Sequence, residues 1–228
     1  MKNDAILCDA SSLISLTDTG FLWVLYELKK RTNVFFMLPQ KVKYECITRP
    51  LGIKKYAIHA IRLQDAINDG ILDVVDLDVE QEGIKIMELA NNLFFARGKP
   101  IHLVDAGEAE QIALTKKLGI NNVLIDERNT RMLIENLEDL RKQQERELRV
   151  RISYNEKNIN IFKNMVKGLF VFRSTEILGI AYEKGLFDKF QGMERPALEA
   201  GLNSLKFNGC SISFEEVGRL MYNLKNPT

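Results

Sequence analysis

The sequence contains few of the residues that build disulfide frameworks or transition-metal sites. Its three cysteines, Cys8, Cys46 and Cys210, are an odd number and show no Cys-x-x-Cys spacing. That pattern excludes a disulfide framework and a zinc site, and it predicts reduced thiols buried in a core. The two histidines, His59 and His102, are isolated, so we expect core or surface roles for them and no histidine metal site.

Two further absences narrow the class of protein. No glycine-rich phosphate loop of either common spacing is present, which argues against a nucleotide-dependent enzyme. The apolar run after residues 1–4 is too short for a signal sequence or a membrane span, so we expect a cytoplasmic protein that does not engage a membrane. With 228 residues, 46% of them hydrophobic and 28% charged, the composition is typical of one large soluble domain.

The charges are unevenly distributed along the chain. The total is +1, but residues 1–127 carry 15 basic and 18 acidic side chains, a net −3, whereas residues 128–228 carry 17 and 13, a net +4. Between Arg141 and Arg173 there are nine bases and three acids. Such a stretch is either a solvated helix face or a patch that attracts a polyanion.

Short apolar runs alternate with longer segments of helical period. The predicted strands are 5–8, 34–37, 71–75, 122–125 and 167–172, and their runs are apolar on both faces, as a buried parallel sheet requires. The predicted helices between them are 21–31, 40–48, 54–68, 79–95 and 105–118. This alternation predicts an α/β chain whose helices cover a parallel sheet.

The second half divides into a polar segment and a compact one. Residues 128–149 favour helix and are so polar that we expect this helix to project from the core or to lie against a partner. From 166 onward, helical apolar patterns return and are expected to complete the same core. We therefore predict an α/β core at 1–130, a charged helical insert at 131–165, and a strand with helices at 166–228 that belong to the same domain.

Acidic side chains follow two of the predicted strands. Asp9 ends the first strand and Asp126 the fourth, and neighbouring strands about 4.8 Å apart would place both carboxylates in one crevice. Glu45 lies on the helix after the second strand, and Glu108 in the first turn of the helix before the fourth. Converging carboxylates repel, and Mg²⁺ or Mn²⁺ removes that repulsion. Together with a basic surface, the cluster indicates metal-assisted phosphodiester hydrolysis.

Several segments resemble those of PIN domains. They are Leu-Cys-Asp-Ala-Ser-Ser-Leu-Ile at 7–14, Leu-Pro-Gln-Lys-Val-Lys-Tyr-Glu at 38–45, Asp-Ala-Gly-Glu-Ala-Glu-Gln-Ile-Ala-Leu at 105–114, Leu-Ile-Asp-Glu-Arg at 124–128, and the stretch 168–185. The resemblance implies a three-layer α/β/α fold with a central parallel sheet of four to five strands and a helical C-terminal extension. It also implies a Mg²⁺- or Mn²⁺-dependent endoribonuclease, often the toxin of a toxin–antitoxin pair.

The same resemblance assigns roles to individual residues. Asp9, Glu45, Glu108 and Asp126 would bind the metal ion, and Ser11 would orient Asp9 or the scissile phosphate. Water activated by the cation would attack the phosphorus in line. Arg128 or Arg131 would hold the phosphate.

Each acid also has a purely structural alternative. Asp9 serves as an ordinary helix cap, Glu45 as a solvated residue and Asp126 as a turn residue. Glu108 completes a capping box with Asp105. Two assignments stay open, because Asp105 competes with Glu108 for the metal and Glu127 competes with Asp126.

The insert is where the sequence departs from a typical PIN domain, since 133–164 is longer and more charged. We expect it to bind RNA, an antitoxin or other protein partner, or a second copy in a homodimer. The candidate RNA surface is Arg141, Lys142, Arg146, Arg149 and Arg151. The main alternative function is a catalytically inactive PIN-like module that binds nucleic acid or protein. A phosphoryl-transfer enzyme with an aspartate nucleophile is disfavoured, because Ser11 stands where such enzymes have a second acid.

Overall fold

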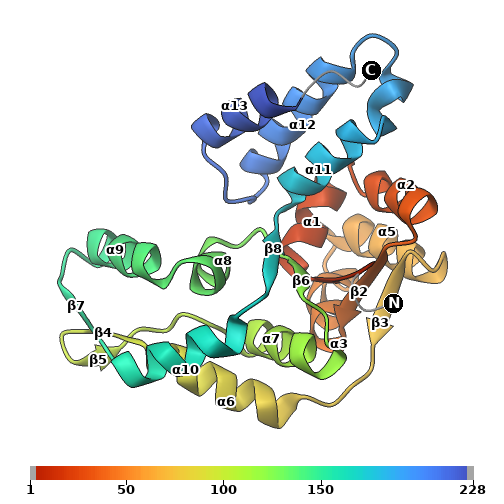
Figure 1. Cartoon of the computed structure of the whole chain (residues 1–228). Coiled ribbons are helices and arrows are strands. Elements are labelled where there is room, and N and C mark those ends of the chain that lie inside the picture. The colour runs from red at the N-terminus through yellow and green to blue at the C-terminus, as the bar shows by residue number, and fades with distance from the viewer. Residues whose placement is uncertain (1–3, 225–228) are drawn as a thin grey trace.

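The centre of the fold is a parallel sheet of five strands. The computed structural model describes residues 4–224 (Figure 1). Residues 1–3 of the predicted core and residues 225–228 of the predicted C-terminal part lie outside the described residues. In spatial order the strands are β3 (Leu72–Val75), β2 (Phe35–Pro39), β1 (Ala5–Cys8), β6 (Asn122–Leu124) and β8 (Phe170–Phe172). All four neighbouring pairs are parallel. The five predicted strands and their parallel arrangement are therefore confirmed.

Helices cover both faces of this sheet (Figure 1). On one side lie α1 (Ala10–Asp18), α2 (Trp23–Thr32), α5 (Ala57–Asn68) and α11 (Ser174–Glu183). The last elements, η3 (Leu186–Phe190), α12 (Glu194–Phe207) and α13 (Phe214–Asn223), extend this layer away from the sheet, where η3 and α12 pack on α11 and α13 packs on α12. The other face packs against α6 (Glu80–Asn91), α7 (Ala106–Leu118), α8 (Arg128–Glu135), α9 (Leu137–Leu148) and α10 (Glu156–Val166). The three-layer α/β/α fold with a helical C-terminal part is confirmed. None of the helices within 4–224 is long and apolar enough to cross a membrane.

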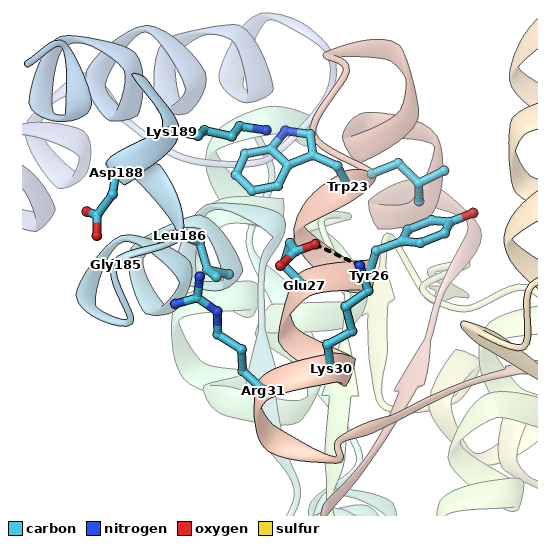
Figure 2. A pocket seen from close by; sticks show the side chains of 10 residues that line it. Trp23, Tyr26, Glu27, Lys30, Arg31, Gly185, Leu186, Asp188 and Lys189 are labelled. Atoms are coloured by element: carbon cyan, nitrogen blue, oxygen red, sulfur yellow. Dashed lines mark hydrogen bonds and ion pairs between the residues drawn. The ribbon is translucent and has the colours of Figure 1, made fainter. Parts of the chain in front are cut away.

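The C-terminal helices share a core with the first helices of the chain. Leu178 and Leu202 are buried in the same apolar cluster as Leu13 and Leu25. Figure 2 shows the outer edge of this contact, where Trp23 of α2 faces η3 and Lys189 lies with its Nζ 3.1 Å from the indole centroid. Burial of these apolar side chains holds the C-terminal helices against the sheet.

The predicted helix over 128–149 is interrupted. The structure has α8 and α9 instead, because Asn136 is extended (φ −156°, ψ 90°) and its side chain accepts the N–H groups of Glu138 and Asp139. An asparagine cap of this kind begins a new helix. The expectation of a helix projecting from the core is also wrong, since Leu133 and Leu140 are fully buried.

A second, small antiparallel sheet was not predicted. Its strands are β4 (Phe94–Ala96), β5 (Lys99–Pro100) and β7 (Ile152–Tyr154), in the order β5-β4-β7. The helix predicted for 79–95 ends at Asn91. Arg97 and Gly98 have φ values of +52° and +77°, so they form a tight turn of the kind that favours a two-residue hairpin.

Candidate functional site

The ends of β1 and β6 bring Asp9 and Asp126 to the same edge of the sheet. Cys8 and Leu124 are register partners, and the N–H of Asp9 donates to the carbonyl of Leu124 at 2.9 Å. The sequence left open whether these two strands are neighbours, and the structure shows that they are. The carboxyl ends of parallel strands are where α/β sheets bind ligands.

Ser11 connects the two acidic strand ends. Its hydroxyl donates to Oδ2 of Asp9 at 2.6 Å, and its N–H donates to the same oxygen at 3.0 Å. The Ser11 hydroxyl also accepts the N–H of Asp126 at 3.2 Å. Burial raises the pKa of Asp9, the Ser11 hydrogen bonds oppose that rise, and the charge of Asp126 adds to it.

Asp126 is completely buried and is held by a residue that the sequence did not point to. Its Oδ1 accepts the N–H of Ser174 and its Oδ2 accepts the Ser174 hydroxyl, each at 2.7 Å, while its backbone carbonyl accepts the N–H of Ser211. Ser174 follows β8 with only Arg173 between them, and β8 is the neighbour of β6. A serine just beyond the end of a neighbouring strand is the signal that could have identified it.

Glu45 lies in a distorted helix, close enough to Asp9 for the two charges to interact. It lies in the π-helix η2 (Tyr44–Thr48), between α3 (Gln40–Lys43) and α4 (Arg49–Leu51), and Pro50 is the second residue after its end. Pro50 has no N–H and its ring crowds the carbonyl four residues earlier, which favours the wider turn. Burial raises the pKa of Glu45, and Asp9 raises it further, while Lys41 lowers it.

Glu108 occupies the first turn of α7 and makes the predicted capping box with Asp105. Its Oε2 accepts the N–H of Asp105 at 2.8 Å, and its Oε1 accepts the hydroxyl of Thr130 at 2.5 Å. Burial raises the pKa of Glu108 to about 7; the two hydrogen bonds oppose this, and Asp9 and Glu127 add to it. Glu108 thus combines a structural role with a position beside Asp9.

The two competing acids lie at the margin of this group. The side chain of Asp105 is 82% exposed and contacts Nε2 of His102 at 2.7 Å. Glu127 caps α8 by accepting the N–H of Thr130 at 2.7 Å. Asp105 therefore faces solvent, whereas Glu127 lies close enough to Glu108 to affect its pKa.

Asp9 is the centre of the electrostatic coupling. Its charge raises the pKa of Glu45 and of Glu108, and Asp126 raises the pKa of Asp9 itself. Within residues 4–224, no three Asp, Glu, His or Cys side chains are arranged as ligands of one metal ion. The oxygens of Asp9, Glu108 and Asp126 instead accept hydrogen bonds from Ser11, Thr130 and Ser174. Carboxylate oxygens are hard ligands of the kind that Mg²⁺ and Mn²⁺ prefer, so the donor atoms of Asp9, Glu45, Glu108 and Asp126 fit such an ion.

A polar groove of about 550 Å³ lies next to Asp126. Its lining includes Arg128, Arg131, Lys206 and Ser211, so the two predicted phosphate-binding arginines face one depression. Arg131 is bound to Glu135 at 2.7 Å, whereas Arg128 is exposed at the start of α8.

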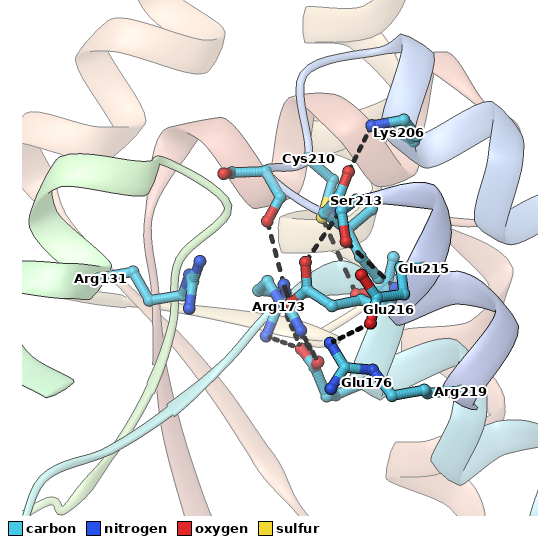
Figure 3. Close-up of polar contacts among 12 residues, drawn as sticks. Arg131, Arg173, Glu176, Lys206, Cys210, Ser213, Glu215, Glu216 and Arg219 are labelled. Carbon is cyan, nitrogen blue, oxygen red and sulfur yellow. Dashed lines mark hydrogen bonds and ion pairs between the residues drawn. The ribbon is translucent and has the colours of Figure 1, made fainter. Parts of the chain in front are cut away.

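Arg173 fixes the far wall of this groove (Figure 3). Its guanidinium donates to the carbonyl of Ser211 at 3.0 Å, to Glu216 at 2.9 Å and to Glu176 at 2.5 Å. Burial raises the pKa of Glu216, but the N–H of Ser213 and the guanidinium of Arg173 together lower it to about 2. These bonds tie the start of α13 to α11 and hence to the strand edge beside Asp126.

The predicted RNA surface on α9 carries many acids. Arg141 pairs with Glu138 at 2.7 Å and with Glu145 at 2.9 Å, and Lys142 lies 3.9 Å from Glu138. Within 137–148 there are four acids and three bases. Arg146, Arg149 and Arg151 are exposed. The charge of this helix is therefore largely balanced by its own side chains.

A family model described as a PIN domain matches residues 5–138. No curated protein matches the chain. The matched range contains Asp9, Glu45, Glu108 and Asp126, and it ends before Ser174.

Proposed function

Because the chain belongs to the PIN-domain family, we propose that it is an endoribonuclease that hydrolyses RNA phosphodiester bonds with Mg²⁺ or Mn²⁺. The observations that support this proposal are the hydrogen bonds that join the strand ends of Asp9 and Asp126, and the electrostatic coupling of Asp9 to Glu45, Glu108 and Asp126. Family membership supports nuclease chemistry, and the carboxylates support the dependence on a cation.

Asp9, Glu45, Glu108 and Asp126 would hold the cation, which supplies Lewis acidity and an activated water when bound. Ser11 keeps Oδ2 of Asp9 in place through two hydrogen bonds. Ser174 does the same for Asp126. These bonds lower the cost of holding two carboxylates in a buried, mutually repulsive group.

Glu108 would hold a proton at its carboxylate, and Arg128 and Arg131 would hold the phosphate. With a pKa of about 7, Glu108 carries a proton on a large fraction of molecules near neutral pH when no cation is bound. Arg128 and Arg131, which line the groove beside Asp126, would bind phosphate oxygens of the substrate.

We further propose that the protein acts in the cytoplasm as the toxin of a toxin–antitoxin pair and forms a homodimer. The resemblance to PIN domains, which are often the toxins of toxin–antitoxin pairs, supports the toxin role. Sedimentation of the purified chain tests the dimer. Co-purification with the product of an adjacent gene tests the antitoxin partner.

The alternative is a PIN-like module that binds nucleic acid or protein without cleaving it. The observation that favours this alternative is the full engagement of Asp126, which is buried and bonded through both oxygens to Ser174. A carboxylate held in this way serves a structural role without any cation.

One experiment separates the two functions. Mn²⁺ is titrated into the wild type and into the variants Asp9→Asn and Asp126→Asn, and cleavage of a single-stranded RNA is measured. The proposal predicts cleavage by the wild type that depends on Mn²⁺ and is lost in both variants. Cleavage without the cation, or cleavage that survives both substitutions, would contradict it. Circular dichroism of each variant controls for folding.

A further inference from the structure

We propose that single-stranded RNA reaches the carboxylates along the surface of α3, η2, α4 and α5. This surface, called here the 41–62 face, is formed by residues 41–62. Bases would stack on Tyr44 and Tyr56, and phosphates would lie against the neighbouring lysines and arginines. The proposal rests on the proposed function, because it names the path by which the substrate of that function enters.

The 41–62 face has the strongest charge imbalance near the site. It carries six bases and a single acid, Glu45, which is the candidate metal ligand. The bases are Lys41, Lys43, Arg49, Lys54, Lys55 and Arg62. In the part of the chain that the structure describes, none of the six lies in an ion pair, and all but Lys43 are exposed. Unneutralised bases of this kind bind phosphates and release counterions.

Two tyrosines stand among these bases with their rings open to solvent. Tyr44 is 54% exposed and Tyr56 is 45% exposed. Lys55 lies over the ring of Tyr56, with its Nζ 5.0 Å from the centroid. Exposed aromatic rings interleaved with cations form the stacking platforms on which proteins bind single strands. Leu51 and Ile58 are two further apolar side chains of this segment that are exposed.

This face is continuous with the carboxylate group. A Cβ atom at Gly107 would lie 3.1 Å from Oε1 of Glu45 and 3.4 Å from Cγ of Lys41, so both side chains rest against the first turn of α7. Lys41 also lowers the pKa of Glu45. Tyr44 precedes Glu45 in the same helix, and α3 and α5 lie beside β2 and β3 (Figure 1). An RNA strand bound to the 41–62 face therefore leads to Glu45.

The same observations argue against a second copy of the chain as the occupant. In a two-fold dimer a surface meets itself, so two faces with six bases each would bring like charges together. The α9 surface is a weaker candidate for RNA, because Glu138 and Glu145 already neutralise Arg141.

Binding, measured apart from cleavage, tests this path. We would titrate a fluorescently labelled single-stranded RNA with the full chain carrying Asp9→Asn, in EDTA, by fluorescence anisotropy at several salt concentrations. The face variant adds Lys43→Gln, Lys54→Gln and Lys55→Gln. The matched control adds Arg146→Gln, Arg149→Gln and Arg151→Gln. The proposal predicts that the face variant weakens binding and reduces the salt slope by about 2, from about 0.7 for each charge lost. The control is expected to stay near the parent.

The tyrosines are tested in the same assay. Replacing Tyr44 and Tyr56 by leucine keeps an apolar surface but removes the rings, and it should weaken binding about five-fold or more for each ring. Replacing both by phenylalanine should preserve the affinity, because the stacking surface stays. Equal circular dichroism spectra show that any loss does not come from unfolding.

Unchanged affinity and salt slope in the face variant would overturn the proposal, as would a larger loss in the α9 control. If the face substitutions abolish self-association while RNA binding is unaltered, the face is a protein interface and the proposal fails. RNA binding through the face by a wild type that does not cleave RNA in Mn²⁺ would support the path and contradict the proposed function. Mn²⁺-dependent cleavage with an unchanged KM, when Lys43→Gln, Lys54→Gln and Lys55→Gln are made in the chain that keeps Asp9, would support the proposed function and contradict the path.

Discussion

Both carboxylate oxygens of Asp126 accept hydrogen bonds from Ser174, each at 2.7 Å. Asp126 lies within the range 5–138 that matches the PIN domain, whereas Ser174 lies 48 residues further along the chain. The two meet because β6 and β8 are neighbouring parallel strands. The C-terminal segment therefore completes the acidic site as well as the apolar core.

Ser174→Ala is expected to lower stability and activity together. The substitution removes the hydroxyl donor to Oδ2 of a completely buried carboxylate, which costs about 1–3 kcal/mol. Urea denaturation measures the stability and RNA cleavage measures the activity. Ser153→Ala is the matched control, because Ser153 is exposed on β7 and should tolerate the change. Equal behaviour of the two variants would show that Ser174 does not support Asp126.

The cation-free protein is expected to lose stability as the pH rises toward 8. Burial raises the pKa of Glu108 from 4.5 to about 7, and the pKa values of Asp9 and Glu45 are raised too. The folded state therefore binds more protons than the unfolded state between these values, and this stabilisation is lost as the pH rises through about 7.

Chemical denaturation in EDTA at pH about 5 and about 8 measures this loss. Glu108→Gln should reduce the difference between the two pH values, because glutamine does not titrate. Mn²⁺ should stabilise the wild type more at the higher pH, where the carboxylates are charged. An equal or larger stability of the cation-free wild type at the higher pH would contradict the assigned cause.

Gly107→Ala is expected to displace Glu45. The new Cβ would lie 3.1 Å from Oε1 of Glu45, which is tighter than an ordinary contact, so the carboxylate must move. We predict weaker Mn²⁺ binding by calorimetry, with thermal stability in EDTA close to that of the wild type, since alanine favours helix over glycine by about 1 kcal/mol. Gly218→Ala in α13 is the control, because nothing lies within 4 Å of its added Cβ. Equal Mn²⁺ affinity in both variants would refute the packing argument.

Arg173→Ala is expected to release the start of α13. The Arg173 side chain is 12% exposed and binds Glu176 and Glu216, so its loss should cost about 1–3 kcal/mol, between the values for exposed and buried pairs. Arg219→Ala removes an exposed pair with Glu215 and should cost less than about 1 kcal/mol. Guanidinium denaturation of the two variants measures the difference. Similar costs would mean that Arg173 does not anchor the helix (Figure 3).

The sheet and the positions of three of the acids could be predicted because their signals are local. A buried apolar run followed by an acid identifies Asp9 and Asp126, and a capping box identifies Glu108, without knowledge of distant residues. The adjacency of the first and fourth strands was left open, because it depends on how the chain crosses over within the sheet.

The features that were missed depend on tertiary contacts. Ser174 acquires its role only when β8 pairs with β6. The break at Asn136 depends on Leu137 and Leu140 turning toward a core that the polar composition of 128–149 conceals. The exposure of Tyr44 and Tyr56 depends on which side of each helix faces the sheet, and the helical period alone does not decide this for segments so short.

Anomalous diffraction at the manganese edge, from crystals of the wild type soaked in Mn²⁺, tests the central claim most directly. The account predicts a peak among the carboxylates of Asp9, Glu45, Glu108 and Asp126, and no peak there in Asp9→Asn. A Mn²⁺ ion found only at exposed acids such as Asp105, with Asp9, Glu108 and Asp126 still hydrogen-bonded to Ser11, Thr130 and Ser174, would contradict it.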